Sequence, residues 1–312
     1  MSAVTQFDII VIGGGPAGLT AGIYLSRAKL NTLILNVGVA GGQMILTHEI
    51  ANYPGVESIS GYKLASIMKK QAQSFGATIK TISAPPVIED EGTLKIVRAG
   101  ETTYSAYSVI LAPGGAPRML GVKGEQDFKG LGVSYCATCD GEFFTGKNIV
   151  VVGGGNSALE EAVSLSRYAE TVTIVHQFDH FQAFPAYVEE AKNNPKIRFI
   201  METEIREFAG DGKLQRVLLH NMKDNKEEWF NADGAFIFIG YQPNTAFVKD
   251  LLPLNERSEI VVNGDMETAV SGIFAAGDSI AKKYRQVTTA VGEATVAALA
   301  AAARTWELKS NH

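Results

Sequence analysis

Cysteine is scarce in this sequence: its 312 residues include two, Cys136 and Cys139. A zinc site built on this pair would need two further Cys or His ligands at matching spacing, and the five histidines are scattered along the chain. An iron–sulfur cluster needs several thiolates and would leave no free dithiol. We therefore expect no metal centre.

Long runs of basic residues and long runs of apolar residues are also missing. The net charge is −5 and no long basic run is present, which argues against a nucleic-acid partner. No apolar stretch reaches the length needed to span a membrane, and the opening residues 1–6 contain no basic region or cleavage site. We expect no membrane partner and a cytoplasmic location.

The two cysteines stand together, in the segment Cys136-Ala137-Thr138-Cys139-Asp140. Two intervening residues let both sulfurs meet within one tight turn, where they can form a disulfide and reopen. Asp140 is placed to move the proton that each thiolate step requires; its alternative role is to cap a helix or turn. A structural bridge over so short a loop would stabilise little. We predict that Cys136, Cys139 and Asp140 are catalytic.

The first residues predict a nucleotide-binding unit. A buried strand at 7–12 enters a glycine turn, a helical pattern follows over 19–27, and a second apolar strand spans 32–35. The turn reads Gly13-Gly14-Gly15-Pro16-Ala17-Gly18. This is the dinucleotide-binding pattern GxGxxG in the strand–turn–helix–strand context that it requires.

Each position of the turn has a physical role. Gly13 makes the tight turn, Gly15 lets the backbone approach a pyrophosphate, and Gly18 lets the helix pack on the strand. The negative charge is received at the helix N-terminus. Asn36 stands where an acid commonly holds the ribose, and an amide can still hydrogen-bond a hydroxyl.

The same unit recurs later in the chain. A strand at 148–152 leads into the turn 153–158, a helix follows over 159–168, and a further strand spans 171–175. Gly153, Gly155 and Ala158 fit the related pattern GxGxxA, which indicates a duplicated architecture.

Breaker clusters at 112–117 and 240–244 place the domain seams. We predict an α/β protein of two Rossmann-like, three-layer nucleotide-binding domains, one inserted into the other. The predicted FAD-binding domain is 1–115 with 245–312, and the central domain with the cysteine pair is 116–244.

With these motifs assembled, the chain resembles the low-molecular-weight thioredoxin reductases over almost its whole length. The resemblance rests on Gly13–Gly18, Gly41-Gly42-Gln43, Ala51-Asn52-Tyr53-Pro54-Gly55, Cys136–Gly141, Gly153–Ala158, Gly277-Asp278 and Arg285-Gln286-Val287.

The resemblance implies that the first fold holds FAD, with Gln43 and Asn52 along it, Asp278 at its ribityl-phosphate region, and residues 285–287 near the flavin ring. The implied cofactor-binding residues are Gly13, Gly15, Pro16, Ala17, Gly18, Asn36, Gly42, Gln43, Asn52, Asp278, Arg285, Gln286 and Val287. It also implies a homodimer in which Cys139 faces the flavin. Cys136 then attacks the disulfide of thioredoxin or a similar small protein.

One segment departs from the family. Members that use NADPH carry His-Arg-Arg and a further Arg four residues on, and these arginines hold the 2′-phosphate. This chain has Gln177, Phe178 and Gln182 at those positions. A switch to NADH would need an acid at the end of the preceding strand, and Asp179, the nearest candidate, lies a few residues late.

We therefore expect an external one-electron carrier, a ferredoxin, as the donor. In this respect the chain resembles the ferredoxin-dependent flavin thioredoxin reductases and the deeply rooted, nicotinamide-independent branch of the family. Three alternatives stay open: an NADH- or NADPH-dependent thioredoxin reductase, a ferredoxin- or flavodoxin–NADP reductase, and a non-catalytic FAD redox sensor. A peroxiredoxin or glutaredoxin-like protein could replace thioredoxin as the partner.

Two further expectations concern the C-terminal region. A long Ala-rich helix is predicted from about Thr289 to Thr305, with Trp306 beyond its end, where the indole could stack over a flavin face. A dimer contact is the alternative role of Trp306. Residues 282–285 form a short basic cluster that could meet an acidic carrier.

Overall fold

The computed structural model describes residues 4–47 and 49–310. The chain divides into two compact units, Met1–Ala116 with Gln242–His312, and Pro117–Tyr241. Each unit is built on a parallel five-stranded sheet with helices, and the second unit interrupts the sequence of the first. The predicted fold class, two Rossmann-like α/β domains with one inserted into the other, is confirmed.

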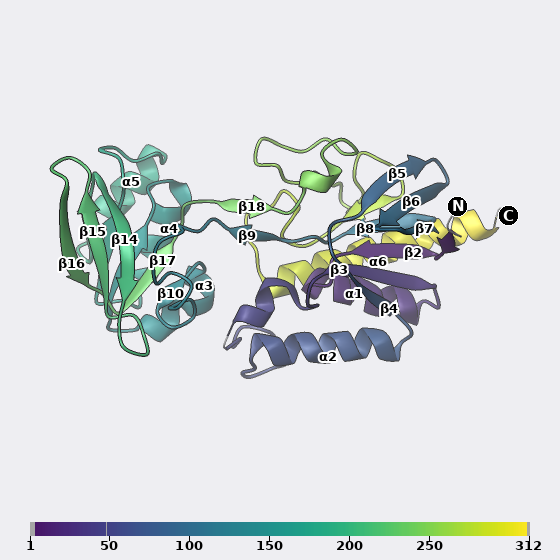
Figure 1. Ribbon diagram of the computed structural model, residues 1–312, viewed down its shortest axis with the longest axis horizontal. Coiled ribbons are helices and arrows are strands. Elements are labelled where there is room, and N and C mark those ends of the chain that lie inside the picture. Colours follow the sequence, from purple (N-terminus) through teal and green to yellow (C-terminus); the bar gives the residue numbers. More distant parts are fainter. Residues whose placement is uncertain (1–3, 48, 311–312) are drawn as a thin grey trace. The chain divides into compact units, whose positions relative to one another are not determined.

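The first unit has three layers (Figure 1). Its parallel sheet has the order β19-β8-β2-β3-β4. Those strands are β2 (Ile9–Ile12), β3 (Thr32–Val37), β4 (Thr78–Ile82), β8 (Ser108–Leu111) and β19 (Ile273–Ala275). The strands β2, β8 and β19 are buried along their whole length, because layers pack on both faces of the sheet.

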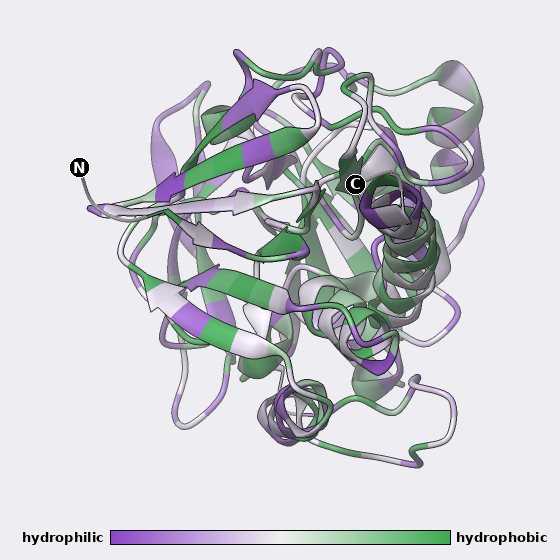
Figure 2. Cartoon of the chain, turned by 90° about the vertical axis from the view of Figure 1, so that its right-hand side faces the viewer, coloured by the Kyte–Doolittle hydropathy of each residue, from purple (hydrophilic) through white to green (hydrophobic). Residues whose placement is uncertain are grey.

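Three helices form one outer layer of this unit: α1 (Pro16–Arg27), α2 (Gly61–Ser74) and α6 (Val287–Ser310). A four-stranded sheet forms the other, from β1 (Thr5–Gln6), β5 (Val87–Glu91), β6 (Leu94–Ala99) and β7 (Thr102–Ala106). Figure 2 shows hydrophobic residues along the strands and α6, with a hydrophilic end at the C-terminus.

The second unit repeats this plan with a parallel sheet of order β10-β17-β11-β12-β13. Its strands are β10 (Val133–Ser134), β11 (Asn148–Val152), β12 (Thr171–Val175), β13 (Ile197–Ile200) and β17 (Gly234–Ile237). Helices α3 (Ala137–Asp140), α4 (Asn156–Leu165) and α5 (Pro185–Lys192) belong to one side. The antiparallel strands β14 (Thr203–Ala209), β15 (Arg216–Asn221) and β16 (Lys226–Asn231) cover the other (Figure 1).

Short elements complete the chain. The two connections between the units include the paired strands β9 (Gly115–Pro117) and β18 (Tyr241–Pro243). The 3₁₀ turns are η1 (Gly42–Leu46), η2 (Gly141–Phe144) and η3 (Ala246–Val248). Among the described residues, no helix combines the length and apolar composition that crossing a bilayer requires.

The first glycine turn is packed without spare room. Gly13 has φ +111°, and a Cβ on it would lie 2.1 Å from the Ala112 carbonyl oxygen. A Cβ on Gly18, within α1, would lie 1.8 Å from the Gly13 oxygen. Helix α1 therefore sits directly on the turn that begins it, and glycine is required at both positions.

We expect Gly18→Ala to lower the free energy of unfolding by about 3 kcal/mol or more, because the methyl group meets backbone that cannot move aside. Gly292→Ala in α6 is the matched control, since a Cβ there has no atom within 4 Å. The control should instead stabilise by ~0.5–1 kcal/mol. Urea denaturation of the two variants measures both effects, and equal midpoints would contradict the packing described here.

The C-terminal helix is longer than predicted, and the expectation that Trp306 lies beyond it is wrong. Helix α6 continues to Ser310, because residues 304–310 contain no glycine or proline to end it. Its rise places Trp306 about 28 Å along the axis from Val287, far from the turn predicted to approach the flavin ring of the same chain. Flavin stacking by Trp306 itself stays a prediction, and within one chain this distance argues against it.

Candidate active site

The cysteine pair forms a disulfide at the start of a short helix. The Cα atoms of Cys136 and Cys139 are 5.3 Å apart and their sulfurs are bonded. Cys136 caps α3, and its Sγ accepts a hydrogen bond from the Cys139 N–H at 3.2 Å. The prediction that both sulfurs meet within one turn is confirmed. Cys136 is half-buried and Cys139 is exposed.

Asp140 directly follows the pair and is half-buried. Burial raises the pKa of its carboxyl, and a hydrogen bond from the Ser134 hydroxyl partly opposes this shift. The Ser134 Oγ lies 2.5 Å from Asp140 Oδ2. A carboxyl with a raised pKa keeps its proton to higher pH than an exposed aspartate, so Asp140 can serve as a proton donor beside the disulfide.

Two neighbours of the pair were missed by the sequence analysis. Ser134 is buried on β10, and its Oγ also accepts the Cys136 N–H at 3.1 Å. Glu125 is buried, and it accepts hydrogen bonds from the Tyr135 hydroxyl at 2.7 Å and from two backbone amides. Burial, together with this carboxylate, raises the pKa of Tyr135. No sequence motif marks either residue, because a single serine or glutamate is common in many unrelated structural roles.

The second set of predicted residues belongs to the first unit. Gly15 precedes α1, and Pro16 and Ala17 form its first turn, where backbone N–H groups lack intrahelical acceptors. A Cβ on Gly15 would have a single neighbour within 4 Å, Gly42 Cα at 3.7 Å. The helix N-terminus is therefore open to a close anionic ligand such as a pyrophosphate. Gln43 is exposed beside Gly42 in η1.

Asp278 follows β19 at the same carboxyl edge of the sheet from which the Gly13 turn leaves β2. Its Oδ1 is buried and, among the residues that the structure describes, accepts no hydrogen bond. The Lys282 ammonium lies 3.3 Å away as an ion-pair partner. A buried oxygen that has an ion-pair partner but accepts no hydrogen bond has capacity for a donor, which fits the predicted role of Asp278 at the ribityl-phosphate region of FAD.

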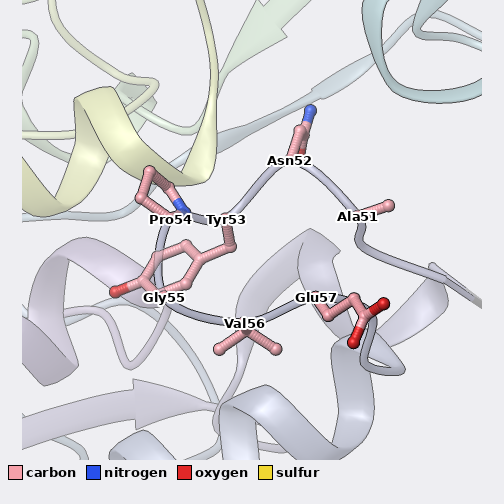
Figure 3. Close-up of a pocket in the computed structure, with 7 residues that line it drawn as sticks. All are labelled: Ala51, Asn52, Tyr53, Pro54, Gly55, Val56 and Glu57. Atoms are coloured by element: carbon pink, nitrogen blue, oxygen red, sulfur yellow. The ribbon is translucent and has the colours of Figure 1, made fainter.

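Asn52 and Gln286 are brought together although 234 positions separate them: Asn52 Nδ2 donates to Gln286 Oε1 at 3.3 Å. Residues 51–57 line a shallow pocket of about 490 Å³ (Figure 3). In that view the Asn52 amide points away from the Tyr53 ring. Gln286 precedes Val287, the first residue of α6, so two predicted FAD contacts meet at one end of this helix.

Arg285 and Asn36 make contacts that the sequence analysis did not foresee. Arg285 forms an ion pair with the buried Glu259, and its Nε donates to the Asp278 carbonyl at 3.3 Å. Asn36 Oδ1 accepts the Gly14 N–H at 2.7 Å, and its Nδ2 donates to the backbone at 37 and 38. Asn36 thus holds the turn itself, and its contact with a ribose stays a prediction.

A half-buried ion pair supports the Asp278 loop, and it was not predicted. Glu293 on α6 accepts the Gly277 N–H at 3.0 Å and holds the Lys282 ammonium at 2.9 Å. Lys282 in turn faces Asp278. Of the basic cluster at 282–285, this lysine is therefore committed to internal contacts.

We expect Glu293→Ala to weaken FAD binding by about tenfold or more, because Gly277 and Lys282 lose the group that fixes the loop beside Asp278. Quenching of FAD fluorescence on titration with apoprotein gives the dissociation constant. Thr295→Ala is a matched control, since within the described part of the chain its hydroxyl bonds to the Val291 carbonyl of the same helix and to no other group. Unchanged affinity in a folded Glu293→Ala variant would remove this role.

The second glycine turn, at residues 153–158, has a backbone similar to that of the Gly13 turn, but different side chains lie around it. Gly153 has φ +136°, and a Cβ on Gly154 would lie 2.3 Å from the His176 ring. A Cβ on Gly155 would meet no described atom within 4 Å. The Gln182 N–H donates to the Gly154 oxygen at 2.8 Å, so the chain after β12 returns across the turn.

Aromatic rings occupy the segment after β12, where the resemblance implies arginines in the members that use NADPH. The buried His176 ring stacks on Phe181 at 5.8 Å and meets the edge of Phe178 at 5.3 Å. Burial lowers the pKa of His176, which favours its neutral form. The exposed Asp179 pairs with His180 at 2.6 Å, and this contact lowers the pKa of Asp179. Residues 176–184 contain no lysine or arginine.

Comparisons with known proteins agree with this geometry. The sequence matches the pyridine nucleotide-disulphide oxidoreductase family over residues 7–294. It is 44% identical over 299 residues to a thioredoxin reductase of Bacillus subtilis, covering 96% of this chain and 94% of that protein. It is 41% identical over 301 residues to a 34.2 kDa protein in the rubredoxin operon of Clostridium pasteurianum, covering 96% and 98%. The crystal structure of a thioredoxin reductase from Streptococcus pyogenes superposes with a TM-score of 0.94 at 37% identity, covering 99% and 100%.

Proposed function

Because this chain belongs to the thioredoxin reductases of the pyridine nucleotide-disulphide oxidoreductase family, we propose that it reduces the disulfide of thioredoxin with electrons from a one-electron carrier rather than from NADPH. The family consists of FAD-dependent flavoproteins, so the protein is an FAD-dependent oxidoreductase with a redox-active disulfide, Cys136–Cys139. We further propose a one-electron carrier as the donor and a homodimer as the assembly.

The dithiol carries out the chemistry on thioredoxin. The Cys136 thiolate attacks one sulfur of the thioredoxin disulfide, and a mixed disulfide forms while the second thioredoxin sulfur leaves. Cys139 then attacks Cys136 Sγ, which restores the Cys136–Cys139 bond and releases the reduced partner. Each leaving thiolate needs a proton, and the half-buried Asp140 beside the pair is suited to supply it.

When bound, FAD supplies a store for two electrons that can be filled one electron at a time. The residues proposed to hold it are those of the Gly13–Gly18 turn, with Gly42, Gln43 and Asn52, and the segment from Asp278 to Val287. The open Gly15 backbone and the buried Asp278 oxygen support this assignment. Residues 1–115 and 245–312 are proposed to form the FAD-binding domain and 116–244 the dithiol domain.

The observation on which the donor assignment depends is the segment after β12. Three positions that would hold a 2′-phosphate carry Gln177, Phe178 and Gln182, and all three are exposed. A hydrogen bond to a charged group stabilises by about 1.5–3 kcal/mol, so the loss of two or three weakens NADPH binding by orders of magnitude. No acid follows Val175 directly to select NADH.

A ferredoxin fits the energetics of the reaction. Plant-type ferredoxins lie near about −400 mV and thioredoxin near about −270 mV, so two electrons run downhill by roughly 6 kcal/mol. A chain with two cysteines cannot also hold an iron–sulfur cluster of its own. Under this proposal the single electrons come from a separate protein that carries the cluster.

An anaerobic titration of the oxidised holoprotein tests the donor. NADPH, NADH and reduced ferredoxin are added in separate experiments while flavin absorbance is followed. We expect rapid bleaching by ferredoxin at stoichiometric amounts and slow or no bleaching by either nicotinamide. Rapid bleaching by micromolar NADPH would refute the donor assignment. Rapid bleaching by NADH would refute it too, in favour of an NADH-dependent thioredoxin reductase.

A further inference from the structure

The hydroxyl of Ser134 lies between the two reacting parts of the dithiol site. It is within 2.5 Å of Asp140 Oδ2 and accepts the Cys136 N–H at 3.1 Å. Ser134 is 5% exposed, so water does not compete freely for either contact. A hydroxyl has one proton to donate, and here the carboxylate is its closest acceptor.

We infer that Ser134 is a positioning residue for the proposed dithiol reaction: its hydroxyl aims the Asp140 carboxyl at the sulfurs and sets the pH range in which that carboxyl donates a proton. The inference rests on the proposed roles of Cys136 and Asp140. It does not depend on which donor supplies the electrons.

The Ser134 hydroxyl and burial act on the pKa of Asp140 in opposite directions. Donation by Ser134 stabilises the carboxylate form of Asp140, while burial favours the protonated form and raises the pKa. Without the hydroxyl, burial acts alone and Asp140 holds its proton more tightly. Because Ser134 also accepts the Cys136 N–H, the carboxyl is tied to the backbone of the attacking cysteine.

The proton balance shows where this matters. In the reactive form the Cys136 proton resides on the Asp140 carboxyl, so Cys136 is the thiolate. When it attacks, an S–S bond forms to thioredoxin, the thioredoxin disulfide breaks, and the leaving thiolate takes that proton from Asp140. When Cys139 closes the Cys136–Cys139 bond, the second thioredoxin sulfur leaves, and the Cys139 proton reaches it through the Asp140 carboxylate. In sum, one dithiol and one disulfide exchange two electrons and two protons.

The test is a single-turnover reaction that needs no electron donor. The protein is reduced with dithiothreitol, the reductant is removed, and thioredoxin disulfide is added at a series of pH values. For Ser134→Ala we expect the alkaline limb of the rate profile to move to higher pH by about one unit, as loss of one hydrogen bond to a charged group implies. Ser134→Thr keeps the hydroxyl and should restore the original limb.

Other carboxyl groups lie on elements packed against α3, namely Glu142 on η2 and Glu160 and Glu161 on α4. The thiols of Cys136 and Cys139 and the Tyr135 phenol are further proton-bearing groups on the same segment. The variant Asp140→Asn separates the contribution of these groups to the pH profile from that of Asp140. In that background, Ser134→Ala should cause no further shift. Thr145→Ala removes an exposed hydroxyl whose one bond among residues 4–47 and 49–310 is to the Glu142 carbonyl, and it should leave the profile unchanged.

A second substrate distinguishes proton donation from attack. The aromatic disulfide 5,5′-dithiobis(2-nitrobenzoic acid) releases a thiolate of low pKa that leaves without a proton. With it, Ser134→Ala and Asp140→Asn should both lose far less rate than they lose with thioredoxin. The infrared carboxyl band lost in Asp140→Asn should titrate at higher pH in Ser134→Ala, which reports on the site without turnover.

The outcomes separate cleanly. A uniform loss of rate in Ser134→Ala at every pH, for both disulfides, would mean a structural role and overturn the inference. An unchanged alkaline limb in Asp140→Asn would overturn it too, since the limb would belong to another group. If the wild-type dithiol fails to reduce thioredoxin at all, the proposed function itself is refuted, whatever Ser134 does.

Discussion

Replacing Cys136 or Cys139 by serine should lower thioredoxin turnover by about a thousandfold or more, because each sulfur forms a bond during the reaction and a hydroxyl cannot replace it. The two variants should fail differently. With Cys139→Ser, Cys136 can still attack but no thiol resolves the product, so a covalent complex with thioredoxin accumulates. With Cys136→Ser the attacking sulfur is gone, and no such complex forms.

Non-reducing electrophoresis after mixing with thioredoxin reads out this difference directly. The chain has two cysteines, so each variant leaves one thiol and the bands are unambiguous. A complex with Cys136→Ser and none with Cys139→Ser would reverse the assignment of the two sulfurs. The exposure of Cys139 in the structure makes this a real test, since Cys136 is the less accessible of the two.

The same variants separate the proposed enzyme from the alternatives. A ferredoxin- or flavodoxin–NADP reductase needs no dithiol, so the double variant would keep its full electron transfer between carrier and nicotinamide. A non-catalytic sensor would show slow thioredoxin reduction already in the wild type. Loss of thioredoxin turnover, with electron flow from the donor to an artificial acceptor retained, supports the reductase alone.

The features predicted from the sequence are those that depend on nearby residues. The turn at Gly13 and its copy at Gly153 each join a buried strand to a helix, so spacing and residue type were enough to place them. The Cys136–Cys139 bond follows from two intervening residues. Local chemistry of this kind survives folding almost unchanged.

The features that were missed or misplaced depend on packing. The Glu293–Lys282 pair joins a helix to the loop before it, and Ser134 meets Asp140 only because β10 runs directly into α3. The bond from the Gly14 N–H to the Asn36 side chain, across 22 positions, was likewise not foreseen. Trp306 was misplaced because nothing in residues 304–310 marks where the helix ends.

Restoring the three arginines should convert the donor preference. The variant with Gln177→Arg, Phe178→Arg and Gln182→Arg is expected to bind NADPH at least about a hundredfold more tightly than the wild type, through two or three charge-assisted bonds to the 2′-phosphate. All three side chains are exposed, so the fold should accept them. The Gln182 N–H that bonds to Gly154 belongs to the backbone and is retained.

The expected signature is selective. NADPH affinity should rise while NADH affinity changes little, because only NADPH has the phosphate, and anaerobic bleaching of the flavin by NADPH should become faster. A control with Gln215→Arg, Met222→Arg and Asn231→Arg adds the same charge at exposed positions, two of them just outside the ends of β15 and the third at the end of β16. Tight NADPH binding by the wild type, or an equal gain in this control, would show that residues 177–182 do not decide the donor.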